Sequence, residues 1–266
     1  MTPRITEAAR AYREKLYPGS AATLYETDPE FVELFANFAF DEVVNAEGAG
    51  GGNLDDRTRF LAILSALVGS QGVEAFKALA PAALAVGLEP VALKELVYQS
   101  MAYVGFGRML PFLLAANEVL GERGECLPLE PQGTTTREDR REAGNRAQVE
   151  IFGEGMRESW TRGPEDRRHV SEWLAANCFG DWYTRGGLTL AERELVTLCL
   201  LAAQGGCEPQ LTGHALGNLR LGNDKELLVG AVSQCIPYVG YPRALNALAC
   251  IDEATERLAA EGEAGA

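Results

Sequence analysis

Two stretches of sequence decide the fold: QSMAYVGFGR at residues 99–108 and QCIPYVGYPR at residues 234–243. Their identical residues, among them Gln99 and Gln234, Tyr103 and Tyr238, Gly105 and Gly240, and Arg108 and Arg243, are all 135 positions apart. The same offset aligns Leu16-Tyr17 with Ile151-Phe152, and Glu118 with Glu253. A constant offset over such a length is the mark of an internal repeat. The chain is therefore interpreted as a tandem duplication.

The join between the two copies is visible in the composition. The segment GERGECLPLEPQGTTTREDR (121–140) combines glycine, proline, a threonine run and charges, which is typical of a linker. We expect a first, degenerate repeat over residues 1–120, a linker over 121–140 and a second repeat over 141–260.

The hydrophobic period within each repeat is helical. Leu190, Leu195, Leu198 and Leu201 recur at helical spacing, and Thr189 with Glu192 matches a capping box. The second repeat is predicted to contain helices over 190–203, from about 209 to 222, over 224–235, where Pro237 would end the helix, and over 242–258. No strand-like alternation competes with these segments. The predicted fold class is all-α, built from two tandem helical repeats.

Composition and charge restrict the function. The 266 residues are 47% apolar and carry a net charge of −14, so binding to nucleic acid or to an anionic membrane is not expected. The longest apolar runs are about half a membrane span, and the N-terminus has no signal-peptide core. Six cysteines without a CxxC pair are interpreted as mostly reduced core thiols, and we expect a cytoplasmic protein. Two histidines, His169 and His214, exclude a histidine-rich metal centre.

The two repeats differ at three chemically important positions. At the common offset, His214 corresponds to Leu79, Cys207 to Gly72 and Glu194 to Arg59. The second repeat therefore holds a glutamate, a cysteine and a histidine that the first repeat lacks, which predicts one catalytic site in the second repeat.

Each candidate also has a structural interpretation. A lone helical histidine such as His214 is more often a satisfied structural residue, but Cys207, two helical turns earlier, favours a functional role. Cys207 stands at the start of a predicted helix, where backbone N–H groups favour a thiolate, but it would also serve as a small buried hydrophobe. Glu192 has a capping role open to it through Thr189. Glu194 enters an apolar helix face, needs a partner there, and is the better candidate for coupling to His214.

The residues of the second repeat resemble the carboxymuconolactone decarboxylase family. The resemblance rests on FGDWYTRGGLTLAERELVTLCLLAAQGGCEPQLTGHALGNLRLGN and PYVGYPRALNAL, and more weakly on LDDRTRFLAILSALVG, AALAVGLEPVALKEL and YVGFGR of the first repeat. It implies an all-helical fold and is closest to the γ-carboxymuconolactone decarboxylase branch, which needs no cofactor. In the alkylhydroperoxidase D-like branch a glutamate, a CxxC pair and a histidine perform thiol redox chemistry. Cys207 and His214 match that motif, but Gln210 replaces its second cysteine.

The resemblance implies a carboxy-lyase that decarboxylates a small carboxylated lactone, such as 4-carboxymuconolactone, as in the catabolism of aromatic compounds. We expect His214 to be the general acid/base, tuned by Glu194. Tyr238, or a helix N-terminal amide near Cys207, would stabilise the enolate oxygen. Arg185 or Arg193 would hold the carboxylate of an anionic small-molecule substrate. Surface salt bridges explain these arginines equally well. Trp182 and Tyr183 would wall the pocket, although core packing explains both aromatic residues too.

Three alternatives remain open at this stage. A thiol-dependent peroxidase would use Cys207, a biosynthetic member would use the same residues for isomerisation or hydrolysis, and a non-catalytic member would only bind a ligand. The resemblance also implies a homotrimer of tandem chains, with about six repeats, and a dimer is the alternative assembly.

Overall fold

The structure is a computed structural model that describes residues 4–18, 24–48, 52 and 54–264. All regular elements in these ranges are helices, which confirms the all-α prediction. The first repeat contains α1 (Glu7–Leu16), α2 (Leu24–Thr27), α3 (Pro29–Asn37), the π-helix η1 (Phe38–Glu42), α4 (Asp56–Gly69), α5 (Val73–Ala85), α6 (Pro90–Val104) and α7 (Phe106–Glu122). The second contains α8 (Arg140–Phe152), the short 3₁₀ turns η3 (Glu154–Met156), η4 (Ser159–Thr161) and η5 (Glu165–Arg167), α9 (Arg168–Trp173), the π-helix η6 (Leu174–Tyr183), α10 (Leu190–Gln204), α11 (Glu208–Arg220), α12 (Lys225–Val239) and α13 (Tyr241–Ala264).

The element boundaries repeat with the sequence offset. Helices α5 and α11 begin and end 135 residues apart, and so do α6 and α12. The π-helices η1 and η6 also fall at corresponding places, each before the long helix that starts the bundle of its repeat. Two copies of one helical unit therefore make up the chain.

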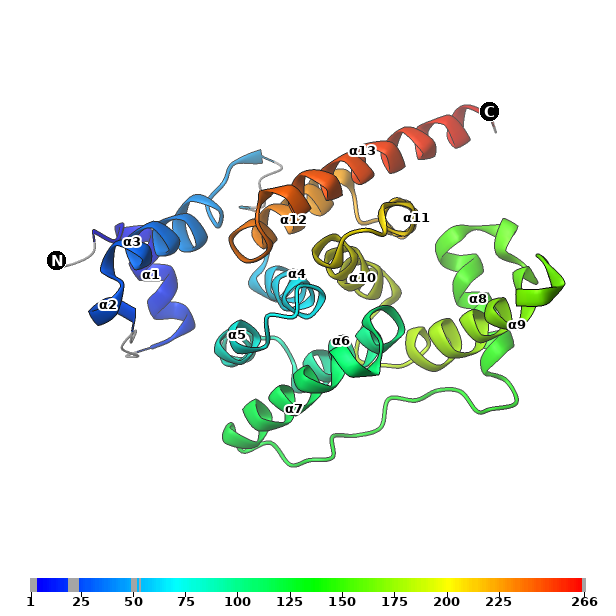
Figure 1. The fold of residues 1–266 in the computed structure, drawn as a ribbon, viewed down its shortest axis with the longest axis horizontal. Coiled ribbons are helices and arrows are strands. Elements are labelled where there is room, and N and C mark those ends of the chain that lie inside the picture. Colours follow the sequence, from blue (N-terminus) through cyan, green and yellow to red (C-terminus); the bar gives the residue numbers. More distant parts are fainter. Residues whose placement is uncertain (1–3, 19–23, 49–51, 53, 265–266) are drawn as a thin grey trace.

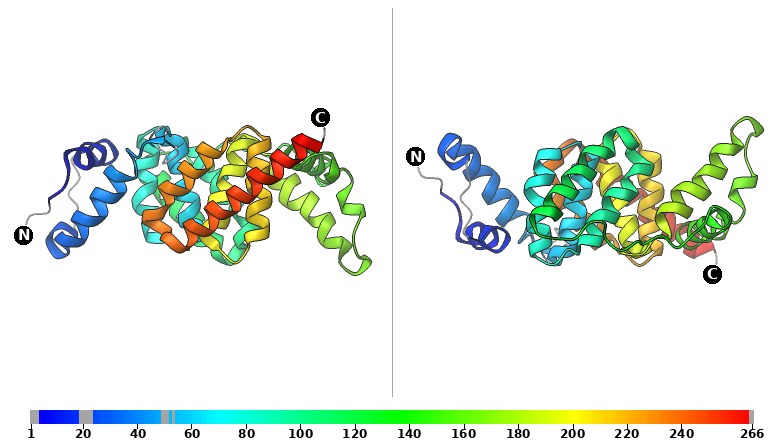
Figure 2. Two further views of the ribbon diagram at one scale, coloured as in Figure 1. Left: turned by 90° about the horizontal axis from the view of Figure 1, so that it is seen from above. Right: turned by 90° about the horizontal axis from the view of Figure 1, so that it is seen from below.

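The central bundle contains α4–α7 of the first repeat and α10–α13 of the second, and the N-terminal helices of each repeat form an arm at one end of it (Figure 1). Helices α4 and α10 lie side by side in the middle, with α12 and α13 on one side of them and α6 and α7 on the other. The arm formed by α1–α3 and the arm formed by α8, α9 and η6 extend from opposite ends (Figure 2). The molecule therefore has an approximate two-fold symmetry.

The contact between α4 and α10 shows where this pseudo-axis passes. Arg57 and Glu192 occupy the same position in the two repeats and form an ion pair with each other. A Cβ atom added to Gly69 would lie 2.3 Å from the carbonyl oxygen of Leu200, so only glycine permits this close approach. The central helices are thus packed backbone against backbone.

Most of the apolar core is shared by the repeats. Val196 and Leu200 of α10 are buried in the cluster formed by α4–α7, and Ala62 and Ala66 of α4 are buried in the cluster formed by α10–α13. Burial of apolar surface is the main stabilising term in folding, so neither repeat keeps its whole core when it is separated from the other.

The prediction of where α12 ends was wrong. Pro237 was expected to stop this helix at Cys235, but α12 continues to Val239 and Gly240 then ends it at a φ of 80°. Proline removes only one backbone donor, and the surrounding packing keeps the helix intact, as it also does at Pro111 in α7.

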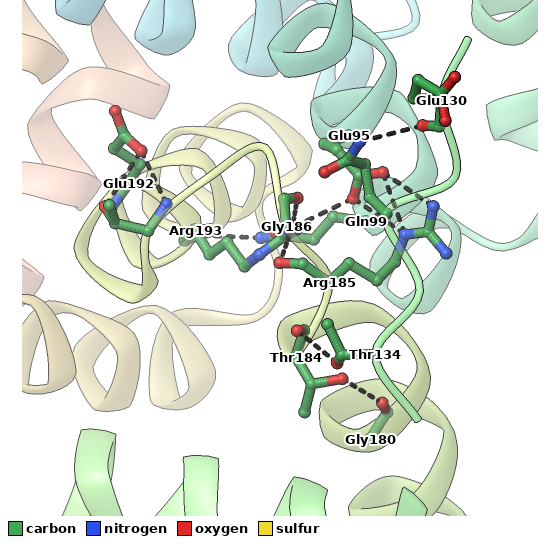
Figure 3. Close-up of polar contacts among 12 residues, drawn as sticks. Glu95, Gln99, Glu130, Thr134, Gly180, Thr184, Arg185, Gly186, Glu192 and Arg193 are labelled. Carbon is green, nitrogen blue, oxygen red and sulfur yellow. Dashed lines mark hydrogen bonds and ion pairs between the residues drawn. The ribbon is translucent and has the colours of Figure 1, made fainter. Parts of the chain in front are cut away.

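The connection between the repeats, residues 123–139, contains no helix and runs along the bundle to the second arm. It is bonded to the segment after η6: Thr134 Oγ1 donates to the Thr184 carbonyl at 2.8 Å, and Gly186 N donates to the Gln132 carbonyl at 2.9 Å (Figure 3). The path of the connection is therefore fixed by specific hydrogen bonds. In the described part of the chain, none of the helices has the length and apolar character needed to cross a membrane.

Candidate functional site

The second repeat brings His214 and Glu194 together. His214 Nδ1 on α11 lies 2.8 Å from Glu194 Oε2 on α10. The glutamate is completely buried, whereas 12% of the histidine side chain is exposed. A carboxylate at Nδ1 fixes the ring orientation and the tautomer with Nδ1–H, so that Nε2 is the nitrogen left for proton transfer. The other oxygen of the glutamate, Oε1, is buried without a hydrogen-bond partner among the described residues.

Gly217 and Asn218 hold this pair in place. Asn218 Nδ2 donates to the carbonyl oxygens of Glu194 and His214, at 2.9 and 2.8 Å, and ties α11 to α10. A Cβ atom on Gly217 would lie 2.8 Å from Glu194 Oε2 and 2.7 Å from Cγ2 of Ile151. Glycine at this position therefore provides the space that the carboxylate occupies.

Two aromatic rings enclose the imidazole. The ring centroids of Tyr103 and Phe152 lie 5.6 and 5.5 Å from that of His214, both with edge-to-face geometry. Phe152 ends α8 of the second repeat, but Tyr103 comes from α6 of the first repeat. The site is therefore built from both repeats.

A chain of hydroxyl groups leads to Tyr103. Its hydroxyl lies 2.6 Å from that of Tyr183, which lies 2.6 Å from Thr197 Oγ1. Gln99 Nε2 donates to Thr197 Oγ1 at 2.8 Å. When Thr197 then donates to Tyr183, and Tyr183 to Tyr103, each of these bonds is satisfied and the O–H of Tyr103 is left to donate onward. Burial raises the pKa of Tyr103 and of Tyr183 well above the usual tyrosine value, so both remain neutral donors.

Cys178 is a protein partner for that remaining O–H. It lies on the π-helix η6, is 7% exposed and is hydrogen-bonded to Tyr103. Burial raises the pKa of its thiol to about 12. A neutral thiol is a weak acceptor, and a substrate oxygen that carries developing charge is a far stronger one. π-Helical segments are frequent at functional sites.

Cys207 does not have the environment of a reactive thiol. It occupies the N-cap position of α11, as expected, but its Sγ faces the Leu201 carbonyl at 3.6 Å. Burial, followed by the neighbouring Glu208 carboxylate, raises the pKa of this thiol, while the Arg243 guanidinium opposes the shift. This direction is opposite to the lowering that was expected at the helix N-terminus, and burial of the thiol is its main cause. Gln210, at the place of a second cysteine, supplies no resolving thiol.

Arg193 and Arg185 share the carboxylate of Glu95 (Figure 3). Arg185 binds it through Nε and Nη2 at 2.9–3.0 Å, and Arg193 Nη2 lies 3.1 Å from it. Arg193 also donates to Gln99 and to the carbonyl oxygens of Arg185 and Gly186, and its Nε has no hydrogen-bond partner among the described residues. Because the side chain is fully buried, it has no exposed face for a substrate. Arg185 is 20% exposed and borders two cavities of about 390 and 450 Å³.

Glu192 and Trp182 have structural surroundings. Glu192 completes the capping box of α10 with Thr189 and pairs with Arg57, so the capping interpretation holds. The indole nitrogen of Trp182 is buried without a hydrogen-bond partner among the described residues, and its neighbour Tyr183 is the residue that reaches the site.

Tyr238 requires a correction. It was expected beside His214, but it lines a cavity of the first repeat together with Leu79, Tyr17 and Phe35. The reason is an exchange between the repeats: α6 packs against α10 and η6, whereas α12 packs against α4 and η1. Each tyrosine therefore serves the other repeat, and Tyr103 takes the place expected for Tyr238.

Sequence reasoning missed most of the supporting residues. The repeat comparison contained a signal for several of them, because Thr197 corresponds to Ala62, Asn218 to Ala83 and Cys178 to Val43. Within the described residues no group of three or more histidine, cysteine, aspartate or glutamate side chains is arranged to hold a metal ion. The arrangement is that of an acid/base pair with a neutral hydroxyl donor beside it.

Comparison with known proteins agrees with the duplicated architecture. The model of the carboxymuconolactone decarboxylase family matches residues 29–118 and 168–253, one match in each repeat and together about two thirds of the chain. No curated protein matches the sequence.

Proposed function

The chain belongs to the carboxymuconolactone decarboxylase family, and we propose that its second repeat is a cofactor-independent carboxy-lyase site for a small carboxylated lactone such as 4-carboxymuconolactone. The observation that carries the proposal is the His214–Glu194 pair at 2.8 Å, with the glutamate fully buried and the histidine partly exposed. Such a pair holds an imidazole ready to take up and deliver one proton.

The proposed reaction breaks the bond between the lactone ring and its carboxylate. The electron pair of that bond moves into the conjugated lactone carbonyl and gives a dienolate, and CO2 leaves. His214 Nε2–H then delivers a proton to carbon and restores the lactone, and the imidazole regains its proton from water. The negative charge of Glu194 stabilises the protonated imidazole before this transfer.

Tyr103 is the proposed donor to the dienolate oxygen. Its ring packs against His214, and its O–H stands at the end of the chain that begins at Gln99. A neutral, preoriented donor stabilises charge that develops in the transition state without reorganisation. This role replaces the one expected for Tyr238.

Arg185 is the residue that we propose attracts the anionic substrate electrostatically. Glu95 is shared by two guanidinium groups, so the trio carries one uncompensated positive charge, and Arg185 is its exposed member. Glu95 precedes Tyr103 by eight residues on α6, which is about 12 Å along a helix. Arg185 therefore draws a carboxylate toward the site rather than touching the carbon that His214 protonates. Arg193 positions Glu95 and Gln99.

The environment of Cys207 favours this function over a thiol peroxidase. A peroxidatic thiol needs thiolate character and a resolving partner, whereas burial raises the pKa of Cys207 and Gln210 stands where the second thiol would be.

The test is CO2 release from 4-carboxymuconolactone by the full chain, compared with His214→Gln and His169→Gln. His169 is the other histidine and contacts only Trp173 among the aromatic rings of the described residues, so its variant is a matched control. We expect His214→Gln to lower turnover by about 10²- to 10⁴-fold and His169→Gln to leave it unchanged. Equal activity of the two variants would refute the role of His214.

A further inference from the structure

The first repeat contains a cavity of about 560 Å³ between its N-terminal arm and the central bundle. We propose that this cavity is a non-catalytic binding site for a neutral ring compound, aromatic or alicyclic, that carries a carbonyl or hydroxyl oxygen. The proposal goes beyond the carboxy-lyase function and does not depend on it.

The cavity occupies the place of the His214 site in the other repeat. Its lining includes Leu79, Tyr238, Tyr17 and Gly72. At the common offset these four residues correspond, in the same order, to His214, Tyr103, Phe152 and Cys207. The first repeat has therefore kept an opening, its tyrosine and an aromatic wall at the position where the second repeat has its acid/base pair.

The residues that would perform proton transfer are absent from this cavity. Leu79 occupies the position of His214, and Arg59 occupies the position of Glu194. Arg59 is buried and its charge is engaged: Nη1 donates to Gln234 at 2.6 Å, Nη2 donates to the Leu54 carbonyl at 2.9 Å, and Nε lies 3.4 Å from Asp56. A ligand in the cavity would meet no general acid or base among these residues.

Tyr238 provides one polar anchor. Its ring lines the cavity, and its hydroxyl has no hydrogen-bond partner among the described residues. In the other repeat, Tyr103 is held by Tyr183, and Tyr183 by Thr197; the corresponding positions are Gly48 and Ala62, which carry no hydroxyl. By contrast, the lining hydroxyl of Tyr17 donates to the Ala78 carbonyl at 3.0 Å. The Tyr238 hydroxyl is thus available to a ligand oxygen.

The walls favour a neutral ring. Phe35 meets Tyr238 and Phe40 edge to face, at centroid distances of 6.1 and 6.0 Å, and all three residues line the cavity. Aromatic rings in this arrangement pack well against another ring. None of the described residues that line the cavity is charged, so an ionised ligand would lose its hydration without gaining a counter-charge from them. The volume lies within the range of small-molecule pockets, about 300–1,000 Å³.

The experiment titrates the full chain with three probes of similar size, and saturation-transfer NMR follows their binding. The probes are methyl naphthyl ketone, ethylnaphthalene and naphthoate. The ketone should bind about 2- to 10-fold more tightly than the hydrocarbon, the range expected for one net hydrogen bond, and naphthoate should bind more weakly than either.

The matched variants remove one hydroxyl from each repeat. Tyr238→Phe should reduce ketone affinity to that of the hydrocarbon, while Tyr103→Phe, the same change at the corresponding position, should not alter it. Ala75→Phe, which places a ring in the cavity, should abolish binding of the ketone and of the hydrocarbon, and its thermal unfolding is recorded to confirm that it folds.

Absence of ketone binding, equal affinity for ketone and hydrocarbon, or an unchanged Tyr238→Phe variant would overturn the proposal. CO2 release from 4-carboxymuconolactone is measured on the same samples and should be unchanged in Tyr238→Phe. If the wild-type chain releases no CO2 but ketone binding follows Tyr238, the carboxy-lyase function fails and the first-repeat site stands.

Discussion

Replacing Gly217 by alanine tests the geometry around Glu194 directly. The added methyl group would lie 2.7 Å from Ile151 Cγ2, 2.8 Å from Glu194 Oε2 and 3.2 Å from Phe152 Cε1. Ile151 and Glu194 are completely buried, so neither side chain can swing into solvent to make room. The backbone of α11 must therefore shift away from α10, or the carboxylate must leave His214.

The magnitude follows from two opposing effects. Alanine in a helix interior is favoured over glycine by about 0.5–1 kcal/mol. Overpacking a dense core costs about 1–3 kcal/mol. Because two of the three contacts are shorter than any relaxed Cβ contact, the cost should dominate. We expect the free energy of unfolding to fall by about 1–2 kcal/mol, and CO2 release to fall as well because Glu194 is displaced.

Gly213→Ala is the matched control. Gly213 lies one helical turn earlier on α11, and a Cβ atom there would meet no other atom within 4 Å. This variant should gain the propensity term alone, about 0.5–1 kcal/mol. Urea unfolding of the two variants measures the difference. Equal stability of Gly217→Ala and Gly213→Ala would show that the close approach at Glu194 does not exist.

Three further outcomes are expected. Glu194→Gln keeps the shape of the side chain but removes the charge that stabilises protonated His214, so CO2 release should fall by about 10²-fold or more; an unchanged rate would count against the pair. Because burial raises the pKa of Cys207, its labelling by iodoacetamide, followed by mass spectrometry, should rise at a higher pH than the labelling of free cysteine in the same buffers; a midpoint below that of free cysteine would favour the thiol peroxidase. We also propose that the chain forms a homotrimer through Phe106 and Tyr241, exposed aromatic residues at corresponding positions of the two repeats that are 57% and 59% exposed. Light scattering should give the mass of three chains for the wild-type protein and of one chain for the double variant Phe106→Ser, Tyr241→Ser. A dimeric wild-type protein would contradict this assembly.

The fold was predictable because helices recognised in one repeat also predict the helices at the corresponding positions of the other repeat. Helices α11 and α12 could be placed from caps and breakers, and the 135-residue offset transfers them to α5 and α6. The error at Pro237 has a local origin. A proline costs one hydrogen bond, and local rules cannot weigh that loss against the packing that holds the rest of α12. For the arms, the sequence showed only that the two repeats align. It did not predict their helix bounds, because no sequence rule identifies π-helical segments.

Only part of the candidate site could be predicted from the sequence. His214 and Glu194 stood out because the first repeat has Leu79 and Arg59 in their places. No such difference marks Tyr103 and Tyr238, since both repeats keep the tyrosine. Which of the two tyrosines meets His214 depends on α6 packing against α10 and α12 packing against α4, and these tertiary contacts have no local signal in the sequence. Likewise, the contacts of Arg193 with Glu95 and Gln99 follow from packing between the repeats.

The exchange of tyrosines explains why the His214 site needs the first repeat, although that repeat has no acid/base pair of its own. The His214 site takes Tyr103 from α6 of the first repeat, and Gln99 on the same helix starts the hydroxyl chain that reaches Tyr103. The first-repeat cavity in turn takes Tyr238 from α12, and Gln234 on that helix binds Arg59. A chain reduced to residues 141–260 would keep His214 and Glu194 but lose the proposed oxyanion donor, and the side chains of Val196 and Leu200 would lose the first-repeat cluster that buries them. Chemistry in one repeat and binding in the other are therefore compatible with a single folding unit, because each site is completed by a helix of the other repeat.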